Sequence, residues 1–150
     1  MAFTIVDGYE RGAERLRARL KAACEPGAGF AEQIETALRT ALALFAAEPE
    51  LGRLLTIRPF AGEEEAIDCY LRWQAYGGEV LRAAAARDPA AHVHPSFVEP
   101  ALIAGICWRI SQHLQAEEAE RLEAVLPDLL ELVFVTYFGA ERAGQLVRAA

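Results

Sequence analysis

The residue types that most often carry out chemistry are few in this sequence, and their spacing does not suit it. Ser96 and Ser111 are the only serines, and neither stands in the Gly-x-Ser-x-Gly motif of a serine hydrolase. His92 and His94 lie one residue apart in a proline-flanked segment without a nearby cysteine, and His113 is distant in sequence. Because a zinc site needs three or four ligands held together, we expect neither a hydrolase nor a metal site.

The acidic runs and the cysteines have simpler explanations than catalysis. Residues 63–65 and 117–120 are rich in glutamate and precede helical patterns, where the positive end of the helix dipole favours carboxylates. No apolar setting in the local sequence favours their protonated form, so they are poor acid–base candidates. Cys24, Cys69 and Cys107 are far apart and form no Cys-x-x-Cys pair, which predicts reduced thiols in a cytoplasmic protein. We therefore expect no enzymatic activity and no cofactor.

The amino-acid composition and net charge indicate which kind of protein this is and which partners it can bind. The chain has 150 residues, 53% of them hydrophobic and 25% charged, which is typical of one soluble globular domain spanning residues 1–150. Its net charge of −7 repels phosphate, so we expect no DNA binding by this chain alone. The first residues do not resemble a signal peptide, and no apolar run reaches the roughly 20 residues of a membrane span. The sequence predicts a cytoplasmic protein without membrane contact.

The hydrophobic periodicity is helical throughout. Apolar residues recur at helical spacing over about residues 8–23, 30–48, 49–56, 63–87, 100–115, 119–138 and 141–149, and no strand pattern occurs. The sequence therefore predicts an all-α bundle of about six to seven helices. We expect Asp7 to cap the first helix, Pro127 to lie in an early turn or to kink its helix, and Gly139 to end that helix.

Two glycines interrupt the predicted helix over residues 63–87. Gly77 and Gly78 follow the polar Gln74, and each glycine costs a helix about 1 kcal/mol relative to alanine. Two interpretations remain open. The glycines admit a neighbouring helix and Gln74 is bonded inside the protein, or a ligand approaches the helix closely here.

The segment 119–138 is too apolar for one buried face. Its apolar residues fall on several sides of a helix, and a second copy of the chain across a two-fold axis would cover the surplus. The small residues of the preceding helix offer a flat surface for close packing. The alternative is a central helix that its own chain surrounds. The predicted homodimer interface contains Ala101, Ala104, Gly105, Leu122, Val125, Leu129, Leu132 and Val133.

Three stretches together resemble a known family. They are LEAVLPDLLELVFVTYFGAERA, the preceding PALIAGICWRISQHL and the upstream ALALFAAEPELGRLL. Over about residues 30–147 this pattern is similar to the C-terminal ligand-binding and dimerisation domain of TetR-family transcriptional regulators. The resemblance implies an orthogonal helical bundle whose last two large helices form a four-helix bundle with the partner. Residues 1–24 resemble the connecting helix that follows the family's helix-turn-helix DNA-binding domain, which has no counterpart here.

The resemblance also implies an effector pocket between the helices over residues 30–48, 63–87 and 100–115. Such a pocket is mostly apolar with a few orienting polar groups. The expected function is a homodimeric effector-binding domain for a small, largely apolar molecule; the alternative is a helical protein-interaction domain without a ligand. The candidate ligand-binding residues are Leu42, Phe45, Phe60, Tyr70, Trp73, Gln74, Trp108 and His113.

Overall fold

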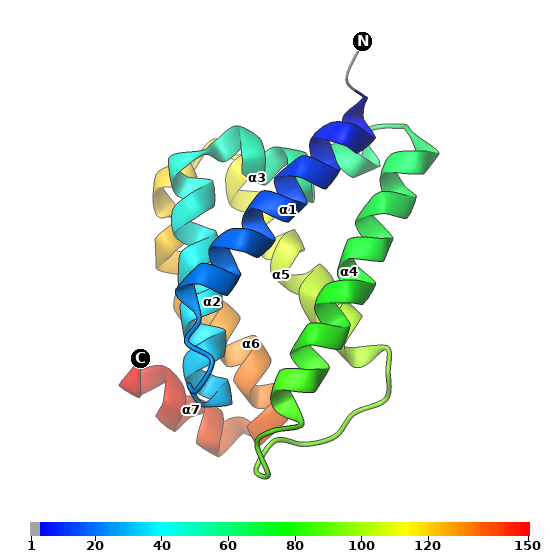
Figure 1. The fold of residues 1–150 in the computed structure, drawn as a ribbon. Helices are drawn as coiled ribbons and strands as arrows, with labels where there is room; N and C mark the ends of the chain where they lie inside the picture. The colour runs from blue at the N-terminus through cyan, green and yellow to red at the C-terminus, as the bar shows by residue number, and fades with distance from the viewer. Residues whose placement is uncertain (1–3) are drawn as a thin grey trace.

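The computed structural model describes residues 4–150 as helices joined by short loops (Figure 1). The part of the chain from residue 4 onward contains no strand, so the all-α prediction is confirmed. The first three residues of the segment 1–24 lie outside the described part. The elements are α1 (Ile5–Ala23), α2 (Phe30–Ala47), α3 (Pro49–Thr56), η1 (Arg58–Phe60), α4 (Glu64–Ala85), α5 (Val98–Gln115), η2 (Ala119–Val125), α6 (Leu126–Phe138) and α7 (Ala140–Ala149).

The helices surround one core. Helix α1 crosses the molecule obliquely and packs on α2, α3 and α4, while α4 packs along α5 (Figure 1). Helix α6 packs against α2, η2 and α7. The largest fully buried side chains include Leu42, Leu114, Phe134 and Tyr137, which come from α2, α5 and α6. Burial of each such side chain contributes roughly 1.5–3 kcal/mol. None of the helices among residues 4–150 is long and apolar enough to cross a membrane.

The first helix begins earlier than its sequence pattern indicates. Thr4 is the N-cap: its hydroxyl accepts a hydrogen bond from the Asp7 backbone N–H at 3.1 Å, and the Asp7 carboxylate accepts from the Thr4 N–H at 3.1 Å. Asp7 is therefore the acidic partner of a capping box and not the cap itself. The prediction that Asp7 caps the helix is wrong by three residues.

The apolar segment 119–138 is divided into two elements. Residues 119–125 form the 3₁₀-helix η2, and α6 starts at Leu126 with Pro127 in its first turn. Proline suits this place, because the N–H groups of a first turn have no partner within the helix. Of the two predicted positions for Pro127, the early turn is confirmed. Gly139, at φ 82°, ends α6 as expected.

The two glycines of α4 allow α5 to approach closely. A Cβ atom added at Gly78 would lie 3.1–3.2 Å from the ring and the backbone nitrogen of Pro100, and one at Gly77 would lie 2.9 Å from Ile103 Cδ1. The prediction that the glycines admit a neighbouring helix is confirmed. Its other half stays a prediction: Gln74 lies beside the Tyr70 hydroxyl, but its Nε2 has no partner in hydrogen-bond geometry among residues 4–150.

Gly78→Ala is expected to lower the free energy of unfolding by about 1 kcal/mol. Alanine gains about 1 kcal/mol of helix propensity, but overpacking against the rigid Pro100 costs roughly 1–3 kcal/mol. Gly8→Ala is the matched control, because its Cβ would lie 3.9 Å from Leu54 in ordinary contact, and this variant should be stabilised. Urea denaturation measures both. Equal stabilisation of the two variants would contradict the close approach of α4 and α5.

Candidate functional site

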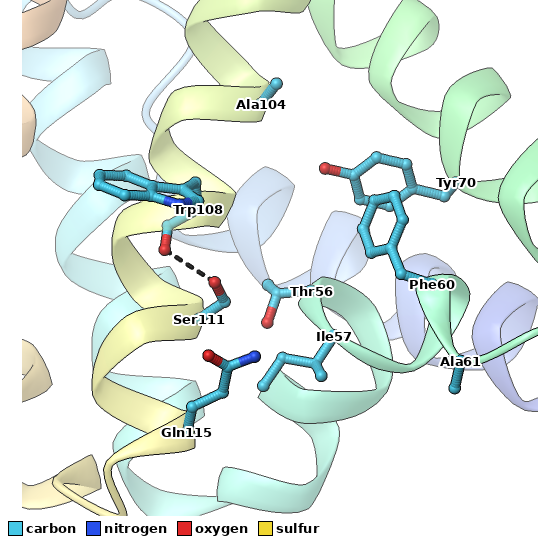
Figure 2. A pocket seen from close by; sticks show the side chains of 9 residues that line it. All are labelled: Thr56, Ile57, Phe60, Ala61, Tyr70, Ala104, Trp108, Ser111 and Gln115. Carbon is cyan, nitrogen blue, oxygen red and sulfur yellow. Dashed lines mark hydrogen bonds between the residues drawn. The ribbon is translucent and has the colours of Figure 1, made fainter.

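A pocket of about 410 Å³ opens between α3 and η1 on one side, α4 on a second and α5 on a third (Figure 2). The chain places apolar residues here because α3 ends at Thr56 and η1 turns immediately, which sets Ile57 and Phe60 opposite α5. No charged side chain belongs to the lining. The lining residues are Thr56, Ile57, Phe60, Ala61, Tyr70, Ala104, Trp108, Ser111 and Gln115.

Aromatic rings form much of the pocket wall. Phe60 and Tyr70 meet edge to face, with ring centroids 4.9 Å apart and an angle of 71° between the planes. Phe60 is 57% exposed and Trp108 is 62% exposed, so both stand at the rim, whereas Tyr70 is buried. The Tyr70 hydroxyl points from α4 toward α5 (Figure 2). The pocket thus has an apolar rim and a polar group at its inner wall.

The other hydroxyls of the pocket donate within their own helices. Thr56 Oγ1 donates to the Gly52 carbonyl at 2.8 Å, and Ser111 Oγ donates to the Trp108 carbonyl at 2.8 Å. Each keeps lone pairs with which it can accept a hydrogen bond. The Tyr70 hydroxyl is therefore the main donor at the inner end.

Gln74 and Cys107 lie beside the Tyr70 hydroxyl, behind the pocket wall. Burial raises the pKa of Tyr70, and it raises the pKa of Cys107 to about 11, so both groups stay protonated at neutral pH. Gln74 is only 7% exposed, and its Nε2 finds no hydrogen-bond partner in the described chain. A buried donor left in this state costs about 1–3 kcal/mol. This amide is the unusual feature of the site.

The structure gathers only part of the predicted ligand-binding set. Phe60, Tyr70 and Trp108 line the pocket, and Gln74 lies directly behind Tyr70. Ile57, which the same sequence pattern also offered as a lining residue, lines the pocket as well, whereas sequence analysis missed Thr56, Ala61, Ser111 and Gln115. The large apolar Phe60 in the short segment after α3 could have indicated this side of the pocket. The chain turns from α3 into η1 here and leaves the Phe60 ring exposed.

Leu42, Phe45, Trp73 and His113 are corrections to that set. Leu42 and Phe45 are 1% and 3% exposed and belong to the core, so they present no surface to this pocket. His113 lies in the last turn of α5, with Nδ1 3.3 Å from a Glu118 carboxylate oxygen but without hydrogen-bond geometry. None of these three lines the pocket.

Trp73 faces a different part of the surface, between α1 and α4. Its Nε1 donates to Glu10 at 2.9 Å, and Glu10 also accepts from Cys69 and Arg72, each at 3.1 Å. Hydrogen bonds from Cys69 and Trp73 lower the pKa of Glu10, which stays ionised. This contact ties α1 to α4. The sequence around Glu10 does not predict this contact, because a partner some 60 positions away leaves no local signal.

The proline-flanked histidine segment is also held to the fold. His94 Nε2 lies 2.6 Å from the Thr136 carbonyl of α6, and the His92 backbone N–H donates to the Tyr137 carbonyl at 2.8 Å. Nearby, Arg82 pairs with the buried Glu99 at 2.7 Å. These contacts fasten the loop between α4 and α5 against α6. Helix α5 begins two residues before its predicted start, and Glu99, the second residue of the helix, is buried.

The predicted interface residues divide into two groups. Leu122, Val125, Leu129 and Val133 are at most 2% exposed, because α2, η2 and α7 surround α6 within the chain. They have no surface for a partner, so their assignment to an interface is corrected to the core. The remaining predicted residues lie at or near the surface. A Cβ atom added at Gly105 would lie 3.5 Å from a methyl carbon of Leu132, so these two residues are neighbours. Together with the exposed Val135 they form what we call the α5–α6 face: Ala101, Ala104, Gly105, Leu132 and Val135.

No protein-family model, curated protein or solved structure matches this chain. The functional argument therefore rests on geometry. The pocket offers apolar surface and a protonated tyrosine, and beside it the α5–α6 face exposes apolar side chains. Among residues 4–150, no three His, Cys, Asp or Glu side chains come together in a way that could hold a metal ion.

Proposed function

We propose that this chain is the effector-binding and dimerisation domain of a TetR-like transcriptional regulator. It binds a small, largely apolar molecule in the cytoplasm and carries out no reaction. The observation that carries the proposal is the pocket of about 410 Å³ with aromatic walls between η1, α4 and α5. Pockets for small molecules are concave, mostly apolar and furnished with few polar groups, and this one falls within their usual size range.

The α5–α6 face supports the dimerisation part of the proposal. Leu132 and Val135 are 39% and 40% exposed, and Leu132 adjoins Gly105 of α5. In a two-fold symmetric dimer, this strip packs against the same strip of the partner subunit. Both copies are then covered, and no further subunits can add to the contact. The resemblance of these two helices to the family's dimerisation helices agrees with this arrangement. With a net charge of −7, the chain leaves DNA binding to a separate, basic domain.

Ligand-induced stabilisation tests the pocket. At a ligand concentration one hundred times Kd, binding adds about 2.7 kcal/mol and raises Tm by several degrees. We expect uncharged apolar compounds to do this, and Trp108→Ala to reduce the rise. Phe97→Ala is the matched control, because Phe97 is equally exposed at 70% but lies outside the pocket. If a broad set of apolar compounds leaves Tm unchanged, the chain is better explained as a ligand-free protein-interaction domain.

A further inference from the structure

The absence of charged side chains from the pocket lining favours an uncharged ligand. Its lining contains no Asp, Glu, Lys or Arg. The closest basic residue along the chain, Arg58, pairs with Glu50 at 2.8 Å. A charged ligand group entering this pocket would lose hydration without gaining a counter-charge, which costs several kcal/mol. An uncharged ligand avoids this cost.

Among the hydroxyls that line the pocket, that of Tyr70 is the one without a backbone carbonyl as its acceptor within residues 4–150. The hydroxyl hydrogens of Thr56 and Ser111 are bound to backbone carbonyls, whereas the protonated Tyr70 hydroxyl points toward α5 across the cavity (Figure 2). Behind the wall, Cys107 and Gln74 are the side chains that interact with this hydroxyl, and the buried Gln74 Nε2 has no acceptor in hydrogen-bond geometry among the described residues. Native proteins rarely leave a buried donor unpaired without a role for it. A ligand acceptor in the cavity would take the Tyr70 hydroxyl hydrogen in preference to Cys107, whose sulfur is a weak acceptor.

We infer that the ligand is an uncharged molecule with an aromatic or flat apolar body and a hydrogen-bond acceptor, such as a ketone oxygen, that the Tyr70 hydroxyl binds. This inference rests on the proposed function. The apolar body lies between Phe60 and Trp108, whose exposed rings offer contact area at the rim. Gln74 acts as a positioning residue: its amide lies behind Tyr70 and favours the hydroxyl orientation in which the hydrogen points to the ligand.

Four probes with the same two phenyl rings on one carbon atom separate these features. Benzophenone carries a ketone, diphenylmethane has no acceptor, diphenylacetate is an anion and benzhydrylamine is a cation at neutral pH. Titration calorimetry on the full chain should rank benzophenone first. We expect it to bind roughly fivefold more tightly than diphenylmethane, because that is the gain in affinity that one neutral hydrogen bond typically gives. The two charged probes should bind at least about tenfold more weakly than benzophenone.

Two variants locate the preference. Tyr70→Phe should bring the affinities for benzophenone and diphenylmethane within about twofold of each other, because only the hydroxyl is lost. Tyr76→Phe on the same helix is the matched control and should keep the preference, since Tyr76 lies outside this pocket. Gln74→Leu should also reduce the preference while leaving the free chain as stable or more stable, because it removes an unpaired buried amide. Gln112→Leu, at an exposed amide of α5, controls for the substitution itself.

The outcomes distinguish this inference from the proposed function. Equal binding of benzophenone and diphenylmethane, or tighter binding of a charged probe, overturns the inference and leaves ligand binding intact. A ketone preference that survives Tyr70→Phe also overturns it. If none of the four probes binds while other uncharged apolar compounds raise Tm, the inference fails and the proposed function stands; if no apolar compound raises Tm, both fail. Loss of stability in Gln74→Leu would show that the amide has a structural role and would overturn its positioning role.

Discussion

Arg82→Leu is expected to lower the free energy of unfolding by about 3 kcal/mol, one of the largest effects of a single substitution in this chain. The Glu99 side chain is 3% exposed and depends on Arg82 at 2.7 Å and on the Tyr137 hydroxyl at 3.2 Å. Removal of Arg82 leaves a buried carboxylate with only one neutral partner. Arg82 also donates a hydrogen bond to the His94 carbonyl at 3.2 Å, so the substitution removes a contact that holds the loop between α4 and α5. Chemical denaturation measures the loss.

Two controls make the result specific. Arg109→Leu breaks a pair with Asp128 in which the carboxylate is 60% exposed, and this should cost less than about 1 kcal/mol. The double variant Arg82→Leu with Glu99→Leu should recover much of the lost stability, because no buried charge remains. If the double variant is as unstable as Arg82→Leu alone, the loss comes from packing and the electrostatic explanation is wrong.

Gly105→Arg is expected to weaken the dimer by at least about a hundredfold. Two-fold symmetry would place two arginines at the centre of an apolar contact, where like charges without partners cost several kcal/mol. The monomer should tolerate the change, because a Cβ at this position meets Leu132 at an ordinary 3.5 Å. Light scattering should give twice 16.4 kDa for the original chain and 16.4 kDa for the variant. The interface should bury more than about 1,200 Å².

Glu117→Arg is the matched control for the dimer. Glu117 is exposed in the turn after α5, so a large basic side chain there should leave the mass unchanged. Circular dichroism would confirm that both variants remain helical. An original chain that stays monomeric at high micromolar concentration would contradict the two-fold contact, whatever the behaviour of the variants.

The helices could be predicted because their signals are local. Apolar spacing, Pro49 and Pro127 in first turns and Gly139 at φ 82° depend on neighbours within a few residues. Even the error at the first helix was local, since Thr4 and Asp7 share one capping box. Such signals fix where a helix begins and ends but not which helix lies beside it.

Long-range pairing explains what sequence analysis missed. Glu10 and Glu99 look like helix-start carboxylates in sequence, yet each is bound by residues from another helix. Leu122 and Leu132 look alike in the apolar pattern of their segment, but one is 0% and the other 39% exposed, because η2 turns the first into the core. Similarly, Phe45 and Phe60 are both aromatic candidates, and only their tertiary neighbours separate core from pocket.

The fluorescence of Trp108 tests the central claim, ligand binding in the pocket, most directly. The variant Trp73→Phe leaves Trp108 as the sole tryptophan, at the pocket rim, whereas Trp108→Phe leaves only Trp73, which lies between α1 and α4. Both variants are titrated with uncharged apolar compounds that are transparent in the tryptophan absorption band. The account predicts a saturable change in emission for the variant that retains Trp108 and none for the variant that retains Trp73. The absence of any saturable change at Trp108, or an equal change at both tryptophans, would contradict a specific binding site in this pocket.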